Sequence, residues 1–540
     1  MRKTNWKIGV EGQGQSVNDI AKKIWQHRGI EDPEDFLNPS SVHILPPSDL
    51  LNIDDAALLL LNHIIKKSNI MIYADTDTDG CTSAAILYHY LKNFDTGHVS
   101  TYINQGKDHG VKDYFQIPID TDLIIVVDSI NDTMQEYRKI LNSGIDLIVL
   151  DHHIIPDTIL PFQKEIHLVS SANHYDNPHL SGSGVTWKFC CHCDYISGYN
   201  YADDLVDLAA TGIIADVCDV GLASMENRAI CNIGFKHLVN TALSAIVSDL
   251  MTATDIGFSI APLVNAANRM DSNELALSLF LQDKVSDAKA VLKELTKIKE
   301  KQKKIVNELF PEFDLQVAEQ ENSPCYFFKV DDRCHNLAGL LATKASDKYR
   351  RPCIVVHDTE QGYAGSMRAD IQANFSEMIN ATGLASCAGH ENAAGILIPH
   401  ETYELFVTTI CGILDDYVDV DAPVDIDLYI ERMQVTPFLI NKLKQMNRIS
   451  GNGFAPVTVL IEGVKDYTVK KLSQGKHLCI NVPDMNFIQW NFNNWDDVDE
   501  EGVLSAYGTI EESFFMGKRS TQMLMEDYVF SKRMKPVSLW

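Results

Sequence analysis

Three aspartates occupy alternate positions in the stretch "YADTDTDG", residues 73–80. Asp75, Asp77 and Asp79 follow the apolar run "NIMIYA", which has the length and composition of a buried strand. Carboxylates placed so close together repel one another and raise each other's pKa unless a cation neutralises them. The spacing therefore predicts that a metal ion binds at the end of this strand.

Further candidate ligands follow two more apolar runs and one helical stretch. "DLIIVVD" ends at Asp128, "DLIVLDHH" ends with Asp151, His152 and His153, and "AATGIIADVCDV" contains Asp216. A single aspartate at such a position is more typical of a helix cap or a loop. Four sets of polar residues at four element ends instead favour one shared site.

The residue types indicate which metal this site binds. Carboxylate oxygens suit Mg²⁺ and Mn²⁺, and the imidazoles shift the preference towards Mn²⁺. The set contains no thiolate, which argues against a structural zinc site. It holds enough carboxylates for two ions, and a two-metal site stabilises both the attacking and the leaving oxygen of a displacement at phosphorus. We therefore predict metal-dependent phosphoester chemistry.

The elements that must position these residues lie between residues 69 and 282. Short apolar runs alternate there with helical patterns, which predicts an α/β fold with a parallel, doubly wound sheet. In such a sheet, ligands bind at the carboxyl ends of the strands near a topological switch point. The three strand ends that carry aspartates are therefore expected to meet at one edge.

Three further segments follow along the chain. Residues 286–310 have the pattern of one long lysine-rich helix, whose charges are typical of a solvated face with i,i+4 pairs. Residues 325–415 form a second α/β pattern. Residues 421–530 are rich in short strands separated by turn signals, which predicts a small β-barrel.

Composition limits the class of protein. The chain has 540 residues, of which 45% are hydrophobic, and a formal net charge of −28. Its 12 cysteines have no disulfide-scaffold pattern, and neither a transmembrane run nor a signal-peptide core is evident, so we expect a cytoplasmic protein that does not bind membranes. The acidic charge argues against a polyanionic partner unless basic residues gather along one path. The candidates for that path are Arg269, Lys344, Lys348, Arg350, Arg351, Arg368, Lys470, Lys471, Lys476, Lys518 and Arg519.

The order and spacing of the motifs carry a family resemblance. "DTDTDG", "VVDS", "DHH" and "GIIADV" resemble the four motifs of the DHH phosphoesterase superfamily. "LSGSGVTWKF", "DIGFSIAPLVNAANRM", "GSMRAD" and "CAGHENAAGILI" resemble the RecJ single-strand exonucleases, and "ISGNGFAPVTVLIEGV" is similar to their oligonucleotide-binding (OB) barrel. The resemblance implies an N-terminal segment (1–50), a DHH catalytic domain (51–282), a connecting helix (283–320), a DHH-associated α/β domain (321–420) and an OB-fold domain that binds nucleic acid (421–535).

The resemblance also implies an activity. Proteins of this family hydrolyse single-stranded DNA from 5′ to 3′ with Mn²⁺ or Mg²⁺, in DNA recombination and repair, and thread the strand between the two α/β domains. The implied metal ligands are Asp77, Asp79, Asp128, His152 and Asp216, with Asp75 and Asp151 as ligands or as neighbours of ligands. His153 matches a contact to the scissile phosphate, and His390 matches a histidine near the active site.

Five positions of this sequence match residues that contact the substrate in the family. Asn265 and Arg269 resemble its strand-contacting pair, and Ser366 with Arg368 resembles its pocket for the 5′-phosphate. Lys107 stands where the family has an arginine, and it offers a point charge in place of a planar fork. Family partners are single-stranded DNA, single-strand-binding protein and recombination or replication proteins, and we expect a monomer.

Other interpretations remain open on the residues alone. A phosphoesterase acting on short oligonucleotides or small phosphorylated nucleotides would share the metals, but the added barrel favours a longer strand. An inactive replication scaffold would not need intact carboxylate motifs. "CCHCD" (190–194) lacks a second ligand pair for zinc and favours buried helical cysteines. "FIQWNFNNW" (487–495) suits either base stacking or barrel packing.

Overall fold

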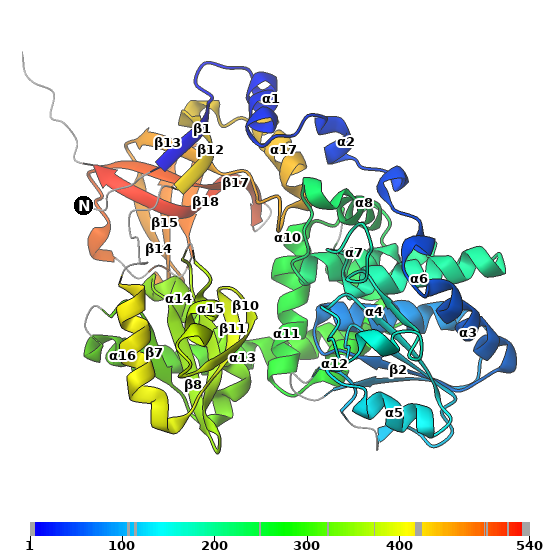
Figure 1. Cartoon of the computed structure of the whole chain (residues 1–540). Helices are drawn as coiled ribbons and strands as arrows, with labels where there is room; N and C mark the ends of the chain where they lie inside the picture. Colours follow the sequence, from blue (N-terminus) through cyan, green and yellow to red (C-terminus); the bar gives the residue numbers. More distant parts are fainter. Residues whose placement is uncertain are drawn as a thin grey trace, which may run out of the picture.

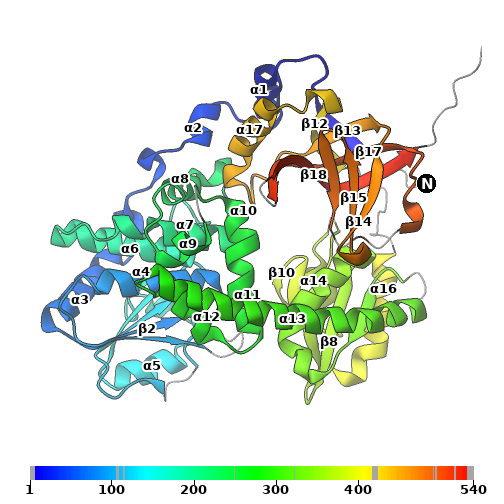
Figure 2. The same ribbon diagram turned by 180° about the vertical axis from the view of Figure 1, so that it is seen from behind.

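The structure of the chain is a computed structural model. It describes residues 6–104, 109–112, 116–247, 250–320, 323–371, 373–415, 424–490, 492, 495–515 and 518–531. The described strands form three sheets, and each sheet lies in a separate part of the molecule (Figure 1). Two α/β domains lie side by side, and the strands of the barrel lie beyond the second of them (Figures 1 and 2).

The first α/β domain contains a five-stranded parallel sheet, as predicted. Its strand order is β3-β2-β4-β5-β6. The strands are β2 (Ile70–Ala74), β3 (Val99–Ile103), β4 (Leu123–Val127), β5 (Asp146–Asp151) and β6 (Leu168–Ser170). β2 and β4 are buried throughout, which explains their unbroken apolar sequences. The chain leaves β2 towards one edge for β3 and returns on the other side for β4, so the switch point lies between β2 and β4.

Helices cover both faces of this sheet. One face packs on a large core formed mainly with α3, α4, α6 and α7, and the other packs on a smaller core that includes α5. The helices of the domain are α3 (Ile53–Lys66), α4 (Thr78–Leu91), α5 (Gln135–Asn142), α6 (Gly182–Ser197), α7 (Val206–Ala215), α8 (Met225–Gly234), α9 (Thr241–Ile246), α10 (Ala253–Asp255), α11 (Ala261–Arg269) and α12 (Asn273–Phe280). A π-helical turn, Ile256–Ile260, joins α10 to α11. Cys190 and Cys193 are buried in α6, as the sequence favoured.

The predicted lysine-rich helix is present, and it extends beyond the lysine-rich pattern of residues 286–310. α13 spans Val285–Glu319 and connects the two α/β domains (Figure 2). The second domain has the strand order β10-β11-β9-β8-β7, in which only β7 and β8 are parallel. Its elements are β7 (Tyr326–Lys329), α14 (Ala338–Tyr349), β8 (Cys353–Thr359), β9 (Gly362–Arg368), α15 (Phe375–Ala381), β10 (Ser386–His390), β11 (Ala393–Ile398) and α16 (Tyr403–Leu414).

The third sheet confirms the predicted strand-rich domain and adds a strand from the N-terminal segment. Its order is β1-β12-β13-β17-β18-β16-β15-β14. The elements are β1 (Trp6–Glu11), α1 (Val17–His27), α2 (Pro33–Leu37), β12 (Val424–Ile430), α17 (Pro437–Met446), β13 (Val459–Val464), β14 (Thr468–Leu472), β15 (His477–Val482), β16 (Met485–Gln489), β17 (Val503–Phe515) and β18 (Lys518–Ser531). β1 pairs in parallel with β12, and Arg28 donates two 2.7 Å hydrogen bonds to Asp427. The N-terminal segment therefore packs with the barrel, while the domain boundaries remain predictions.

Candidate metal centre

The acidic residues predicted to bind metal meet at the switch point between β2 and β4. Asp75, directly after β2, and Asp128, directly after β4, are buried. Asp128 has a φ of 56°, a left-handed conformation that is uncommon for a residue other than glycine. Such strain gathers at functional sites, where the surrounding structure enforces it. A Cβ on Gly182, in α6, would lie 2.5 Å from Asp128 Oδ1, so only glycine lets the helix approach this carboxylate.

Two buried ligand atoms at this point lack a hydrogen-bond partner within the described residues. They are Asp128 Oδ1 and His152 Nε2, which lie 3.2 Å apart. His152 Nε2 also lies 3.6 Å from Asp216 Oδ2. Burial, and then the negative charges of Asp79 and Asp77, raise the pKa of Asp128 well above its ordinary value. A bound cation would remove the repulsion and give both atoms a partner, so the residues present fit a metal ion.

Asp79 is held at the start of helix α6. Gly182 N donates to Asp79 Oδ2 at 2.7 Å, and Ser183 N donates to Oδ1 at 3.1 Å. The N-terminal end of a helix stabilises an anion through its free N–H groups and its dipole. A Cβ on Gly212, in α7, would lie 2.1 Å from Asp79 Oδ1. Two glycines therefore let two helices close around the site.

Asp75 and Asp77 form a second group that shares Asp128. Asp77 caps α4, since Gly80 N donates to its Oδ1 at 2.9 Å. Burial, and then the Asp77 charge, raise the pKa of Asp75 well above its ordinary value. Ligand atoms of Asp75, Asp77 and Asp128 lie within 4.8 Å of one another, and so do those of Asp128, His152 and His153. Because Asp128 lies in the first group and also beside His152, it would contribute to the binding of both ions.

The carboxylate oxygens of Asp151 accept hydrogen bonds from neighbouring residues of the chain. Its Oδ1 accepts hydrogen bonds from the backbone N–H groups of His152 (2.6 Å) and His153 (2.7 Å) and lies 2.8 Å from His153 Nδ1. Its Oδ2 accepts from Ile130 N at 2.5 Å. Burial opposes charge on both groups, but their attraction lowers the pKa of Asp151 and raises that of His153. Asp151 is therefore placed to orient His153 and to keep it cationic.

Three neighbours of the centre were not anticipated. His109 Nδ1 lies 3.2 Å from Asp75 Oδ1, and Ser129 Oγ donates to the same oxygen at 3.4 Å. Cys218 Sγ donates to Asp216 Oδ2 at 3.3 Å. His109 and Ser129 follow β3 and β4, so the rule that ligands gather at strand ends was the signal for them. Lys107, predicted to bind substrate, lies outside the described residues.

Burial, and then the Asp79 charge, raise the pKa of Asp216 to about 6. A ligating carboxylate must lose its proton, so protons compete with the metal below that pH. We expect the affinity for Mn²⁺ to fall about tenfold for each pH unit below 6 per proton displaced. Electron paramagnetic resonance of free Mn²⁺ at pH 7, 6 and 5 measures this affinity. An affinity unchanged across that range would contradict the expectation.

The predicted strand-contacting pair lies on one helix. Asn265 and Arg269 are both half-buried on α11, and their spacing of four residues puts them on one face. Asn268, also on α11, donates to Thr76 O and so ties this helix to the loop that carries the aspartates. Burial, and then the nearby charge of Arg368, lower the pKa of Arg269. Two guanidinium groups from different domains therefore lie near each other.

The predicted residues of the second domain lie at the same end of its sheet. His390 pairs with Ala393, which in turn pairs with Arg368, so these residues lie side by side across β10, β11 and β9. Ser366 is two positions before Arg368 on β9 and is half-buried. His390 is exposed. Arg368 Nη1 donates to Met367 O at 2.7 Å, which leaves other donors of the guanidinium for a ligand.

Comparisons with known proteins identify the family. Residues 69–213 match the model of the DHH family, N-terminal domain, and residues 426–527 match that of the RecJ OB domain. The SPbeta prophage-derived protein YorK of Bacillus subtilis, named as a single-strand DNA-specific exonuclease, is 30% identical over 422 residues, which are 71% of this chain and 72% of that protein. RecJ of B. subtilis is 26% identical over 96% of this chain and 68% of its own length. The chain belongs to the RecJ family.

A solved structure shows the same fold as this RecJ-family chain. Thermus thermophilus RecJ, crystallised in complex with Mn²⁺, matches 99% of this chain and 81% of its own with a TM-score of 0.78 and 21% identity. A second structure of that protein, with Mg²⁺, gives a TM-score of 0.70. The predicted α/β fold and OB-type barrel are therefore confirmed. Among the described helices of this chain, none is long and apolar enough to cross a bilayer.

A basic groove lies between the second α/β domain and the barrel of this RecJ-family chain. α13 and α14 form one side, and the β15–β16 end of the barrel forms the other (Figure 2). The groove has a volume of about 780 Å³. Five cations line it against two carboxylates. These residues are Lys303, Lys344, Lys348, Arg350 and Lys476, with Asp314 and Asp347.

The same groove contains an exposed aromatic ring. Trp490 is 50% exposed, and the His477 ring contacts it edge-on, with 4.8 Å between the ring centres. Lys348 Nζ pairs with Asp314 at 2.6 Å and lies 5.2 Å from the centre of the Phe310 ring. Four of the five cations belong to the predicted nucleic-acid path, and they converge here with the aromatic segment. "Basic groove" below refers to this cavity.

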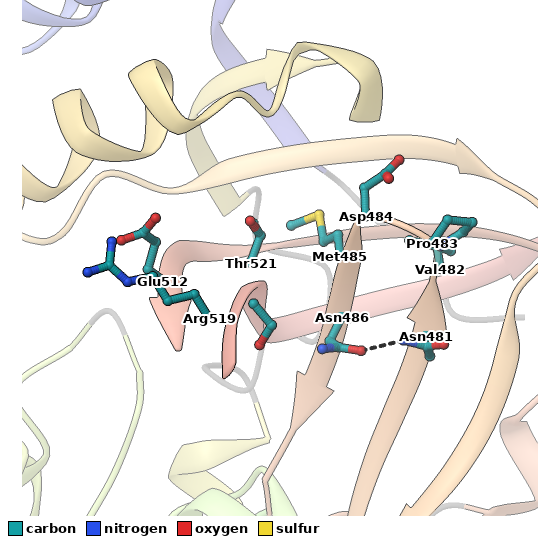
Figure 3. A pocket seen from close by; sticks show the side chains of 10 residues that line it. Asn481, Val482, Pro483, Asp484, Met485, Asn486, Glu512, Arg519 and Thr521 are labelled. Carbon is teal, nitrogen blue, oxygen red and sulfur yellow. Dashed lines mark hydrogen bonds between the residues drawn. The ribbon is translucent and has the colours of Figure 1, made fainter. Parts of the chain in front are cut away.

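A second hollow, of about 330 Å³, lies within the barrel and is less basic (Figure 3). Arg519 lies on it beside Glu512, and Asp484 is on its rim. Asn481 donates to Asn486 across adjacent strands at 2.7 Å. Arg519 therefore lies apart from the basic groove, although the sequence places both on one predicted path.

Proposed function

We propose that this RecJ-family chain is a metal-dependent exonuclease that degrades single-stranded DNA from its 5′ end, in recombination and repair. The observation that carries the proposal is a pair of buried atoms at the switch point of the catalytic sheet, Asp128 Oδ1 and His152 Nε2, which have no hydrogen-bond partner among the described residues. They lie among carboxylates whose mutual repulsion a bound cation would relieve. The YorK and RecJ relatives are named as single-strand-specific exonucleases, which supports the substrate class.

The ligand set suits Mn²⁺ or Mg²⁺. The residues that would hold the ions are Asp75, Asp77, Asp79, Asp128, His152 and Asp216. When bound, the ions supply a nucleophile from water near neutral pH and stabilise the charge that develops at phosphorus. Asp128 is placed to contact both ions, since it belongs to both ligand groups.

The protein's own cations act on the substrate. His153, kept cationic by Asp151, presents N–H donors to a phosphate at the centre. Arg269 lies on the same helix as Asn265, and both would grip the backbone of the strand. Arg368, Ser366 and His390, at the end of the second domain's sheet, would receive the terminal 5′-phosphate. Recognition of the terminal phosphate by these residues would set the 5′-to-3′ polarity.

The basic groove extends this path towards the barrel. Its lysines suit the phosphates of a single strand, and the exposed ring of Trp490 suits a base. The groove also reconciles the net charge of −28 with a polyanionic substrate, because its five cations outnumber its two carboxylates. We also propose that the chain is a monomer in the cytoplasm and that it works with a protein that binds single-stranded DNA.

One time course tests the proposed activity. We would incubate the full chain and Mn²⁺ with 3′-labelled single-stranded DNA, and in parallel with duplex DNA, single-stranded RNA and a dinucleotide. A ladder that shortens from the 5′ end of single-stranded DNA alone is expected. Hydrolysis of the dinucleotide without the ladder would instead move the chain to the small-substrate phosphoesterases. No hydrolysis of any substrate would overturn the proposal.

Arg368→Ala should remove the preference for a 5′-phosphate. A charge-assisted hydrogen bond contributes about 1.5–3 kcal/mol, so the rate ratio between phosphorylated and hydroxyl ends should fall about tenfold to a hundredfold. Single-turnover cleavage of two otherwise identical strands measures this ratio, and each variant is its own control. An unchanged ratio would remove Arg368 from the pocket.

The double variant Trp490→Ala, Lys476→Ala should bind long DNA single strands more weakly but very short ones as tightly as the wild type does. Stacking contributes about 1–3 kcal/mol per base, and a protein that neutralises one phosphate fewer has a plot of log affinity against log salt that is shallower by about 0.7. Fluorescence anisotropy on a long and a very short oligonucleotide, at several salt concentrations, measures both effects. Lys164→Ala, an exposed lysine of the catalytic domain, is the matched control. Equal binding of the long strand by the double variant would exclude the basic groove from the path.

A further inference from the structure

The thiol of Cys218 lies at the metal centre. Its Sγ is 3.3 Å from Asp216 Oδ2, which is 3.6 Å from His152 Nε2. One ligand atom from each of these three residues lies within 4.8 Å of the other two. The carboxylate, imidazole and thiol thus lie as close to one another as the ligands of a single metal ion do.

The end of helix α7 turns Cys218 towards the centre. Asp216 ends the helix, and the next residue, Val217, has a φ of 57°. Val217 N donates to Ile214 O at 3.2 Å, and Cys218 N donates to Ile213 O at 3.1 Å. This pair of bonds is the Schellman motif, whose left-handed position normally takes glycine. A β-branched residue at that position is strained, and the two backbone hydrogen bonds hold the turn that places Cys218.

A separate observation shows that a cation would fit at this point. The Asp128 side chain is only 2% exposed, and its Oδ1 has no hydrogen-bond partner in the described part of the chain. It faces His152 Nε2 at 3.2 Å, an atom that is equally unpartnered. Asp128 and Asp216 therefore both approach the same imidazole nitrogen, and Cys218 contacts Asp216.

We infer that Cys218 is a ligand of the ion held by His152 and Asp216, and that its thiolate makes this position select thiophilic divalent ions such as Zn²⁺, Co²⁺ and Cd²⁺ over Mg²⁺. The inference rests on the metal centre of the proposed function but not on the nuclease activity. Soft sulfur ligands favour such ions, whereas an all-oxygen site favours Mg²⁺ and Mn²⁺. On ligation the S–H proton passes to solvent and sulfur bonds to the metal.

Selectivity of this kind has a functional consequence. A thiolate, an imidazole and a carboxylate bind Zn²⁺ tightly, so Zn²⁺ displaces Mn²⁺ from one of the two positions. The second group, Asp75, Asp77 and Asp128, contains no sulfur and keeps its preference for the harder ions. The two positions would therefore prefer unlike metals.

The test is a titration of the full chain with Co²⁺. Visible absorption reports that cobalt is bound, and a thiolate-to-cobalt charge-transfer band in the near ultraviolet reports a sulfur ligand. We expect this band in the wild type and in Cys411→Ser, a half-buried cysteine of α16, and its loss in Cys218→Ser. Competition with Zn²⁺ should show an affinity at least about tenfold lower in Cys218→Ser.

Each other outcome overturns the inference. Cobalt bound by the wild type without the charge-transfer band would mean that Cys218 only donates a hydrogen bond to Asp216. A band that persists in Cys218→Ser would place the sulfur ligand elsewhere, and a wild type that binds no Co²⁺ would exclude the thiophilic site. Circular dichroism confirms that each variant is folded, and the wild-type spectrum is informative without any variant. Mn²⁺-dependent nuclease activity, assayed separately, shows whether the proposed function fails independently.

Discussion

Asp128→Asn should reduce metal-dependent cleavage of single-stranded DNA by about a thousandfold or more, because a two-metal site contributes several kcal/mol and Asp128 serves both ligand groups. An amide has nearly the same shape as the carboxylate but no charge, so the fold should persist. Single-turnover rates at saturating Mn²⁺ measure the loss. The matched control is Asp157→Asn, which changes an exposed aspartate six residues after the strand that carries Asp151.

The same substitution should stabilise the metal-free protein. Burial, and then Asp79 and Asp77, raise the pKa of Asp128, so the folded state holds this proton more tightly than the unfolded state does. The stability that this group contributes is fully present below its pKa in the unfolded state, about 4. That stability is lost as the pH rises through the raised pKa of the group in the folded state. Near neutral pH the burial of this ionisable group therefore destabilises the metal-free wild type. Asparagine carries no such group.

Thermal melting separates these effects. With a chelator near pH 7.5, Asp128→Asn should melt at a higher temperature than the wild type. With Mn²⁺, the wild type should gain stability by mass action and the variant should gain far less. Wild-type turnover together with an undiminished gain on adding Mn²⁺ would remove Asp128 from the site.

The parts of the centre that could be predicted lie at the ends of regular elements. Asp75 and Asp128 follow strands so apolar that only a buried parallel sheet explains them, and the switch-point rule then brings them together. Helix α13 was predictable because its charges repeat at helical spacing. These inferences require only local periodicity and one topological rule.

Contacts between distant segments were not predictable. β1 joins the barrel by pairing with a strand more than four hundred residues later, and a short mixed sequence does not encode its partner. Cys218 was absent from the predicted ligands because its approach depends on the turn at Val217, a left-handed residue that sequence does not reveal. Asp151 matched a ligand motif, yet neighbouring N–H groups occupy its oxygens. Such outcomes depend on tertiary packing.

The buried guanidinium of Arg228 joins three parts of the chain. Arg228 is 1% exposed, and its Nε donates to Phe36 O at 2.6 Å. Its Nη1 donates to Val220 O and to Ile449 O, both at 2.9 Å. The guanidinium also lies 3.7 Å from the centre of the Phe36 ring. The acceptors belong to the N-terminal segment, the catalytic domain and the segment after α17, so one side chain ties the barrel unit to the catalytic domain.

Arg228→Ala should destabilise this junction by about 3–5 kcal/mol, because it leaves several buried carbonyl groups without donors and opens a cavity against an aromatic ring. The midpoint of the first urea transition measures the loss, and limited proteolysis should show earlier cleavage between the N-terminal segment and the catalytic domain. Arg138→Ala removes an exposed arginine that also lies over an aromatic ring, 5.0 Å from the centre of Phe162, and should change stability little.

Arg228→Met separates hydrogen bonding from charge and volume. Burial lowers the pKa of Arg228 to about 9, which shows that the fold disfavours its charge, so methionine removes a cost while filling similar space. The carbonyl groups of Phe36, Val220 and Ile449 nevertheless stay buried and lose their donor. We therefore expect Arg228→Met to lie between the wild type and Arg228→Ala. A methionine variant as stable as the wild type would mean that packing on Phe36, and not the three hydrogen bonds, holds the junction.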